Sequence, residues 1–226
     1  MVKIINIILR IIFRHKLLSI TLFLLLAGSG KVFSQESKRM NNWLFGQNAW
    51  LTWNELRTIS NIPRVDIGHT GAPAITLNDL PKSLEGNKMD QQEGVSCLSD
   101  ENGELMFYSD GVNIWNKKHE YMQKTDGTVG YGQSVLPGNP SSSQSGVAIP
   151  YPDNPDKYIF LGIEHNQYTG FGYVVVDMTK NTGLGGIQPV PGAQPTNKKY
   201  ISRGSANGSS PGEPLTALRH ANGRDI

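Results

Sequence analysis

The chain of 226 residues contains a single cysteine, Cys97. One thiol cannot form an internal disulfide framework, so the fold depends on its hydrophobic core. Cys97 lies within an apolar strand pattern, which favours a small buried side chain over a reactive nucleophile.

Patterns that carry catalysis or metal binding are also missing. The serine tract 141–145 lacks the Gly-x-Ser-x-Gly elbow of an esterase and is expected to be a flexible entry into a strand. We therefore expect no catalytic, cofactor-binding or metal-binding residue, and no cofactor. Acidic residues near predicted strand ends, which no spacing pairs for hydrolysis, are Glu93, Asp110, Glu164 and Asp177. Histidines beyond residue 34, none at a metal-binding i and i+4 spacing, are His69, His119, His165 and His220.

Two oxygen-rich turns fall short of calcium loops. The turn Ser99–Gly103 does not continue to the Glu at position 12 of an EF-hand loop. It also has Glu101 where the hairpin box of sialidase-like propellers has Asp. Its Asn102-Gly103 pair suits a tight hairpin, so we favour a structural role. In the second turn, hydration by water is favoured over calcium; its oxygen-bearing residues are Asp153, Asn154 and Asp156.

The first 34 residues contain five basic residues and no acidic one, with an apolar run from Leu17 to Ala27 and small residues after it. This is the layout of a secretory signal peptide, cleaved before Gln35. The apolar run is shorter than the roughly 20 residues of a membrane span. The alternative is an uncleaved anchor that adds the apolar stretch 4–13, but it would bury the charges at positions 14–16. Because no cysteine stands next to the end of the leader, bacterial lipoprotein processing is excluded.

Removal of this leader reverses the sign of the net charge. Without its five basic residues, 16 basic residues face 19 acidic ones, so the mature chain is near −3 instead of +2. No basic cluster interleaved with aromatic residues is left, which excludes a nucleic-acid groove. Residues 35–226 are long enough for one domain with its own core.

Long helical periodicity is absent from residues 35–226, whereas glycine, proline, serine and asparagine are frequent, which indicates an all-β fold with many turns. Asn41–Trp53 is expected to form a hairpin or strand pair, with Gly46 and Asn48 in its turn. Proline and glycine interrupt residues 54–92, for which we expect loops with one or two short edge strands.

The clearest pattern is Glu93–Asn116, which predicts three consecutive antiparallel strands. Within it, Leu105–Tyr108 is apolar on both faces, as is typical of a strand buried between two sheets. The expected elements, in order, are a strand around Val95 and Cys97, the turn Asp100–Gly103, a strand Glu104–Ser109, the turn Asp110-Gly111 and a strand Val112–Asn116.

This pattern recurs in degraded form. A second unit is expected to use strands 145–149, 158–163 and 172–178, with a turn over 151–157. A third unit opens at Pro214–Leu218 and turns at His220–Gly223. Residues 185–212, rich in glycine, proline, serine and asparagine, are expected to be a variable loop between units.

Similar four-stranded units with variable loops predict a partial β-propeller of WD40/YVTN-like blades, about three in an incomplete ring. An open ring exposes apolar flanks, so we expect Ile226 to be an artificial end and the natural protein to continue. The alternative is a complete β-sandwich closed by the last strand.

An ordered set of segments spans nearly the whole mature chain: Asn42–Gly46, Glu93–Leu98, Leu105–Gly111, Ile114–Asn116, Ser141–Ser145 and Leu215–Ile226. As a set they resemble the N-terminal propeller-like region of large secreted proteins from gliding bacteria of the Bacteroidota. Such proteins usually carry the gliding-motility-associated sorting domain of type IX secretion at their far C-terminus. The resemblance implies further blades and export across the outer membrane. This chain contains neither further blades nor that sorting domain.

These features favour a secreted, extracellular or outer cell-surface protein. We expect a non-enzymatic role in binding, adhesion or scaffolding, linked through the resemblance to type IX secretion and gliding-type surface machinery. Its partner would be an extracellular protein or a glycan, with no stable membrane span after signal cleavage. The alternative is a secreted glycan or peptide hydrolase with its site in the mouth of the complete propeller.

Two observations would separate these functions. A cluster of two or three carboxylates around one pocket would favour the enzyme, whereas an open cleft with loop asparagines and serines would favour the binding protein. Exposed tryptophans could stack on sugars. However, Trp43 and Trp115 lie within predicted strands, where burial in a core is favoured.

Overall fold

The structure is a computed structural model, and it describes residues 38–62, 74–91, 93–139, 141–163, 171–188 and 199–202, together with Ala217. The chain divides into two units, Met1–Ser37 and Lys38–Ile226, and every described residue belongs to the second. Within the described residues no helix has the length and apolarity needed to cross a membrane. Several predicted features lie outside the described residues: the leader 1–34, His69, Glu164, His165, His220 and the third unit apart from Ala217. Ala217 has no regular secondary structure.

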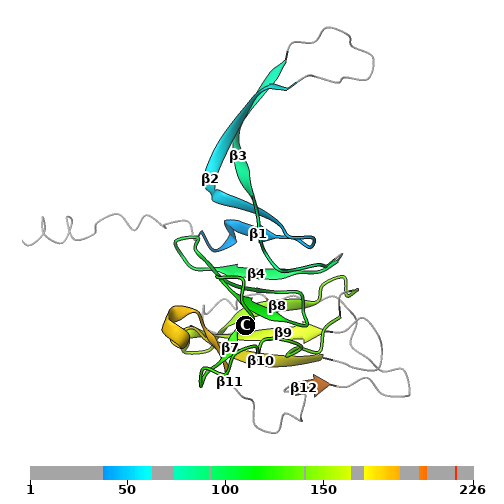
Figure 1. Ribbon diagram of the computed structural model, residues 1–226, viewed down its shortest axis with the longest axis vertical. Coiled ribbons are helices and arrows are strands. Elements are labelled where there is room, and N and C mark those ends of the chain that lie inside the picture. Colours follow the sequence, from blue (N-terminus) through cyan, green and yellow to red (C-terminus); the bar gives the residue numbers. More distant parts are fainter. Residues whose placement is uncertain are drawn as a thin grey trace, which may run out of the picture. The chain divides into compact units, whose positions relative to one another are not determined.

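The predicted all-β class is confirmed, because the described residues form several small β-sheets (Figure 1). No closed ring of sheets is present among them. Pairing is antiparallel except between β7 (Gln123–Lys124) and β11 (Gly186–Gln188). The first sheet has the order β1 (Asn42–Leu44), β2 (Ala49–Ile62), β3 (Ile75–Glu85), and the second has the order β4 (Ser96–Ser99), β5 (Leu105–Ser109), β6 (Ile114–Asn116). The third has the order β7 (Gln123–Lys124), β11 (Gly186–Gln188), β10 (Phe171–Asp177), β9 (Asn154–Ile163), β8 (Gly146–Tyr151), with β12 (Lys199–Ser202) also on β10.

The hairpin predicted over Asn41–Trp53 is confirmed as β1 and β2. Between these strands, Gln47 (φ 56°) and Asn48 (φ 63°) adopt the left-handed conformation that a two-residue hairpin turn requires. The predicted burial of Trp43 is wrong, because its side chain is 47% exposed and contacts Trp53 at 4.6 Å between ring centroids. Strand alternation places Trp43 on the face opposite the buried Leu44.

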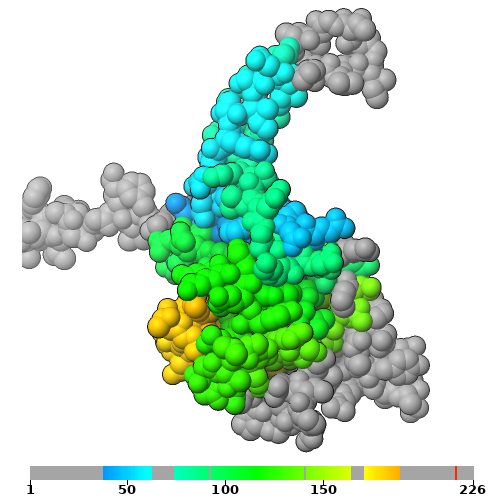
Figure 2. Space-filling view, in the orientation of Figure 1, coloured from blue at the N-terminus to red at the C-terminus, as the bar shows by residue number. Residues whose placement is uncertain are grey.

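The loops predicted for residues 54–92 are wrong over much of that range. β2 continues to Ile62 and pairs with β3 as far as Ile75, with register shifts along the way. Pro81 is tolerated within β3 because this strand lies at a sheet edge. The distal part of the hairpin, cyan in Figure 2, carries exposed apolar side chains: Leu56 (55%), Ile59 (36%) and Leu77 (42%).

The three strands predicted in the central motif are confirmed as β4, β5 and β6. The turn Asp100–Gly103 has a structural role: the Asp100 carboxylate accepts hydrogen bonds from the backbone N–H groups of Asn102 (2.8 Å) and Glu104 (2.9 Å). Of the Asn102-Gly103 pair, Gly103 alone has positive φ (91°), and the register shifts between Leu98 and Ser99. The turn is therefore a bulged hairpin and not the tight two-residue form.

Both faces of the second sheet are buried, as the apolar pattern of β5 predicts. On one face, Phe107 packs against Tyr158 and Phe160 of the third sheet, with ring centroids 5.7 and 6.1 Å away. On the other face, Tyr108 and Trp115 belong to a cluster with residues of the first sheet, such as Leu44. The second sheet therefore lies between the other two.

The third sheet confirms the strands of the predicted second unit but extends them. β8 and β9 run into the predicted turn 151–157, leaving only Pro152 and Asp153 (φ 57°) between them. β11 and β12 lie within residues 185–212, which were expected to be a loop. Both strands are held by pairing with β10, which local composition does not report.

The prediction that the serine tract 141–145 is flexible is wrong at two positions. Ser142 and Ser145 are fully buried. The Ser142 hydroxyl donates to the carbonyl of Ile163 at 3.1 Å, and the Ser145 hydroxyl donates to the carbonyl of Gly94. A side chain at Gly111 (φ 82°) would collide with Ser145. The tract is a polar connection between the second and third sheets.

Candidate functional site

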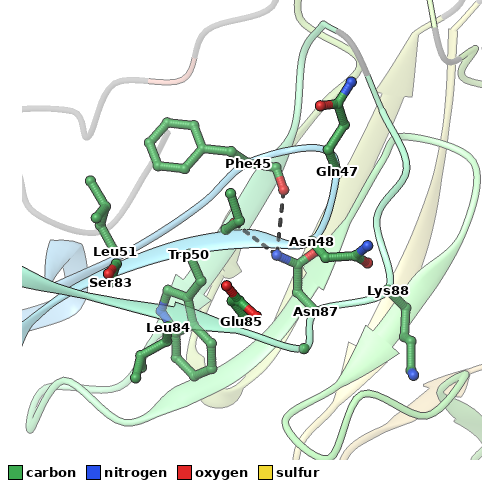
Figure 3. A pocket seen from close by; sticks show the side chains of 12 residues that line it. Phe45, Gln47, Asn48, Trp50, Leu51, Ser83, Leu84, Glu85, Asn87 and Lys88 are labelled. Atoms are coloured by element: carbon green, nitrogen blue, oxygen red, sulfur yellow. Dashed lines mark hydrogen bonds between the residues drawn. The ribbon is translucent and has the colours of Figure 1, made fainter.

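A cleft of about 690 Å³ lies where the β1–β2 turn meets the end of β3 (Figure 3). We call it the edge cleft, because β3 is the edge strand of its sheet. It is larger than two other hollows in the described residues, of about 420 and 410 Å³. Its lining residues are Phe45, Gln47, Asn48, Ala49, Trp50, Leu51, Ser83, Leu84, Glu85, Gly86, Asn87 and Lys88.

Side chains reach the edge cleft from both faces of the β2–β3 ladder. The register pairs Trp50 with Leu84 and Leu51 with Ser83. Successive pairs point to opposite faces of a sheet. In Figure 3 Leu51 accordingly lies on the side opposite Trp50 and Leu84. The cleft thus offers apolar surface on both sides of a strand end.

One side chain, Asn87, ties the strands together beside the cleft. It is 1% exposed. Its amide N–H groups donate to the carbonyls of Ala49 (2.8 Å) and Phe45 (3.4 Å), and its oxygen accepts the N–H of Met89 (3.0 Å). Asn87 is therefore part of the framework of the cleft, and its polar atoms are already used.

The side chains that face solvent at the cleft are of mixed chemistry. Gln47, Asn48, Glu85 and Lys88 are exposed, and the Phe45 ring is 40% exposed. The carboxylate of Glu85 is the acidic group among the lining residues. Neither Glu85 nor Lys88 forms an ion pair with another described residue. The site offers one anion and one cation to a ligand.

The backbone of Lys88 is bonded to the buried side chain of Tyr108, which in turn contacts His119. The backbone N–H of Lys88 donates to the Tyr108 hydroxyl at 3.1 Å, and that hydroxyl lies 3.0 Å from His119 Nδ1. Burial raises the pKa of Tyr108 to about 12, so the phenol keeps its proton. Burial, and next the positive charge of Lys88, lower the pKa of His119. The phenol and the imidazole share this hydrogen bond, and the tautomer of His119 decides which of them donates.

The side chain of Trp50, which also lines the cleft, has no free polar atom. Trp50 donates its indole N–H to Asn42 Oδ1 at 3.1 Å and presents only ring surface. Its ring also meets His119 edge-on, at 5.8 Å between centroids. Trp50 therefore contributes apolar contact area to a ligand.

The acidic residues considered from the sequence do not gather in this cleft. Asp110 is 7% exposed and accepts hydrogen bonds from the N–H groups of Val112 (2.9 Å) and Asn113 (2.6 Å). Asp177 accepts hydrogen bonds from Thr179 and lies 3.6 Å from the Lys157 amine. Both carboxylates hold local turns, and neither lines the described clefts.

The described residues also contain no metal-binding cluster and no activated thiol. No group of three or more His, Cys, Asp or Glu residues in the described part of the chain could hold a metal ion. The Asp153–Asp156 turn is closed locally, since Asn154 Oδ1 accepts the N–H of Asp156 at 3.1 Å. Cys97 donates to the carbonyl of Asn42 at 3.1 Å, and burial raises its pKa, which favours the unreactive thiol.

A second hollow, the inter-sheet cleft, has a volume of about 420 Å³. It is lined by one edge strand of each described sheet, β1, β4 and β8, and contains no charged side chain. β1 contacts β4, and β4 contacts β8. An edge strand of each described sheet therefore neighbours an edge strand of the next.

The sequence did not indicate the edge cleft. Its residues come from two segments, 45–51 and 83–88, which β2–β3 pairing brings together. The second segment lay in the range expected to be loops. Comparison of the chain with protein-family models, with curated proteins and with solved structures gave no match.

Proposed function

We propose that the chain is a secreted or cell-surface binding protein without enzymatic activity, and that its ligand occupies the edge cleft. The role is adhesion or scaffolding by a rigid β platform. The link to type IX secretion and gliding-type surface machinery rests on the sequence resemblance alone.

The chemistry of the clefts carries this proposal. Hydrolysis of glycans by acid pairs needs two carboxylates across one site. The edge cleft contains Glu85 as its carboxylate, and the inter-sheet cleft has no charged lining residue. The remaining polar groups of the edge cleft are amides, a serine hydroxyl and Lys88, which suit recognition more than bond cleavage.

The propeller-like architecture belongs to the same proposal. A blade of a propeller is covered on both faces by its neighbours, and one of its edge strands lies toward a shared centre. The covered faces of the second sheet support this arrangement, as does the contact of β1 with β4 and of β4 with β8. We propose that the described sheets are blades of a partial ring.

Binding is tested with the full chain on a sensor surface, against an array of defined glycans and an array of defined extended peptides. The double variant Glu85→Lys, Lys88→Glu should bind the best ligand at least tenfold more weakly. The matched control is Glu104→Lys, Lys117→Glu, which exchanges exposed charges outside the cleft and should bind as the parent does.

Turnover is measured on the same ligands, as release of new reducing ends or new amino termini. No turnover is expected. Catalytic release that survives in the control and disappears in the cleft variant would identify an enzyme and overturn the proposal. Equal binding by parent, control and cleft variant would show that the ligand does not bind in the edge cleft.

Export is tested separately, by N-terminal sequencing of the protein recovered outside the cytoplasm of an expressing bacterium. The expected terminus is Gln35. An intact Met1 in membrane fractions would instead support the uncleaved anchor.

A further inference from the structure

Two of the three described sheets have a further extended segment beyond their third strand. In the second sheet, Tyr121 forms a bridge with Trp115 of β6, and the hydrogen bonds from Asn116 N–H to Glu120 O (2.9 Å) and from Met122 N–H to Ile114 O (2.8 Å) flank it. In the third sheet, β11 and β12 both pair with β10. A fourth position is thus occupied in both sheets.

Among the described residues, the first sheet has no such neighbour. Its order ends at β3, and no hydrogen bond between described backbone groups reaches the outer side of Ser83–Gly86. Unpaired N–H and C=O groups along an exposed strand are a template for pairing with another strand. No described strand occupies the fourth position of the first sheet, which lies at the edge cleft.

The sequence of β3 limits where a strand can be added. Pro81 has no N–H and interrupts the donor row of the edge. After Pro81, Lys82–Glu85 continues the strand, and its last residues line the edge cleft. This stretch of four residues spans about 13 Å, enough for a short added strand. Beside this stretch, the cleft has an apolar side chain on each face of the sheet, Leu51 on one face and Trp50 on the other.

We propose that an extended segment of another polypeptide adds to β3 along Lys82–Glu85 and becomes the fourth strand of the first sheet. The inference rests on the proposed binding function and names the ligand class as a peptide. Main-chain hydrogen bonds supply affinity in this mode, and alternate side chains supply specificity.

The cleft also specifies the chemistry of the partner. Side chains of the added strand must alternate between two apolar surfaces, so both faces of the segment carry apolar residues. Lys88 is exposed at the cleft without an ion pair to a described residue, and so favours a carboxylate on the partner.

A second copy of the chain fits this edge less well. When two copies of β3 pair antiparallel, side chains on the same face of the sheet lie opposite each other only if the pairing is centred on a residue. Centring on Ser83 puts Lys82 opposite Leu84, and centring on Leu84 puts Lys82 opposite Gly86. Neither register places Lys82 opposite Glu85, so the edge charges do not complement each other.

The probe is a display library of ten-residue peptides with valine, isoleucine, threonine or tyrosine at consecutive positions, so that both faces carry them, and one aspartate, selected on the full chain. Selected peptides are then resynthesised with single N-methyl groups. Methylation at alternate positions should weaken binding at least tenfold, and methylation at the positions between should not, because only every second N–H points to β3.

Hydrogen exchange of the protein gives an independent readout. Peptide binding should slow amide exchange in Ser83–Gly86 at least tenfold and leave the edge before Pro81 unchanged. Lys88→Glu should weaken the aspartate-containing peptides at least fivefold, whereas Lys117→Glu, an exposed control outside the cleft, should not.

Each other outcome overturns the inference. No selected peptide, or peptides insensitive to N-methylation, excludes strand addition. Slow exchange, before any peptide is added, of the Ser83–Gly86 amides that do not point to β2 means that this chain fills its own edge. Glycans that bind at the cleft while peptides do not would reject the peptide and keep the proposed function, whereas cleavage of the bound ligand would reject both.

Discussion

The first and second sheets have the same order of three antiparallel strands, but they differ in how much of them is covered. The second sheet is buried on both faces, with Phe107 and Tyr108 fully enclosed on opposite sides. The first sheet is covered near Leu44 and exposes Trp43 on its other face. Its hairpin continues beyond the core, with Leu56 exposed.

This difference shows that strand pairing and strand burial have separate causes. β5 is apolar at consecutive positions and needs a neighbour on each side. Beyond Trp53, β2 mixes charged, polar and apolar residues, and its strand conformation is held by pairing with β3. A two-stranded ribbon gains little stability alone. Of the described sheets, the first is therefore the one whose strands are ordered by pairing more than by burial.

The largest effect is expected from Phe107→Ala, which opens a cavity between the second and third sheets. Truncation of a fully buried Phe costs about 3–5 kcal/mol of unfolding free energy. Urea denaturation followed by tryptophan fluorescence measures it. A loss below about 1 kcal/mol would mean that the two sheets do not rely on this contact.

Asn87→Ala should have the next largest effect and probes the first sheet. It removes the hydrogen bonds of Asn87 to backbone groups of Phe45, Ala49 and Met89, at a cost of about 1–3 kcal/mol. The Ala49 carbonyl keeps the N–H of Phe45 as a partner. Hydrogen exchange should increase at the β1–β2 turn more than in β5. Equal increases in both sheets would show that the first sheet is not separately held by this side chain.

A smaller effect is expected from pH. The folded-state pKa of His119 lies below its ordinary value of 6.5, because of burial and then Lys88. The unfolded state therefore binds the proton more tightly, and this stabilisation, complete above pH 6.5, is lost as pH falls through the folded pKa. Denaturation at pH 7.5 and 5.5 should show less stability at the lower value. In His119→Gln the difference should shrink, and an unchanged difference would assign the effect to other groups.

The smallest effect is expected from Leu56→Ala in the distal hairpin. Because the side chain is 55% exposed, the unfolding free energy should change by less than about 0.5 kcal/mol. Thermal denaturation alongside Phe107→Ala measures the contrast. A loss comparable with that of Phe107→Ala would mean that the distal hairpin is covered in solution, and the comparison of the two sheets would fail.

The sequence predicted the second sheet well because its information is local. The apolar run Leu105–Tyr108, the Asn102-Gly103 turn and the Asp110-Gly111 turn all lie within one short segment. The β1–β2 hairpin was also predicted, from aromatic residues around Gly46 and Asn48. In both cases, turn chemistry and strand pattern agree with each other.

The long β2–β3 ribbon and the edge cleft could not be predicted in the same way. Pro81 reads as a breaker in the sequence, but it is acceptable at a sheet edge. The burial of Ser145 likewise depends on close approach to Gly94 and Gly111, which are distant in the chain. Long-range pairing decided these features, and residue composition does not report it.

The enclosure of β5 sets an order of events as the chain is synthesised. Tyr108 belongs to a cluster with Leu44 and Trp50, which precede it in the chain, and stacks on Trp115 of β6. Phe107 is covered by Tyr158 and Phe160, which follow much later. One face can close once β6 emerges, and the other forms only after β9. Nascent chains that end before β9 should bind a hydrophobic dye or a chaperone, and chains that include β10 should release it.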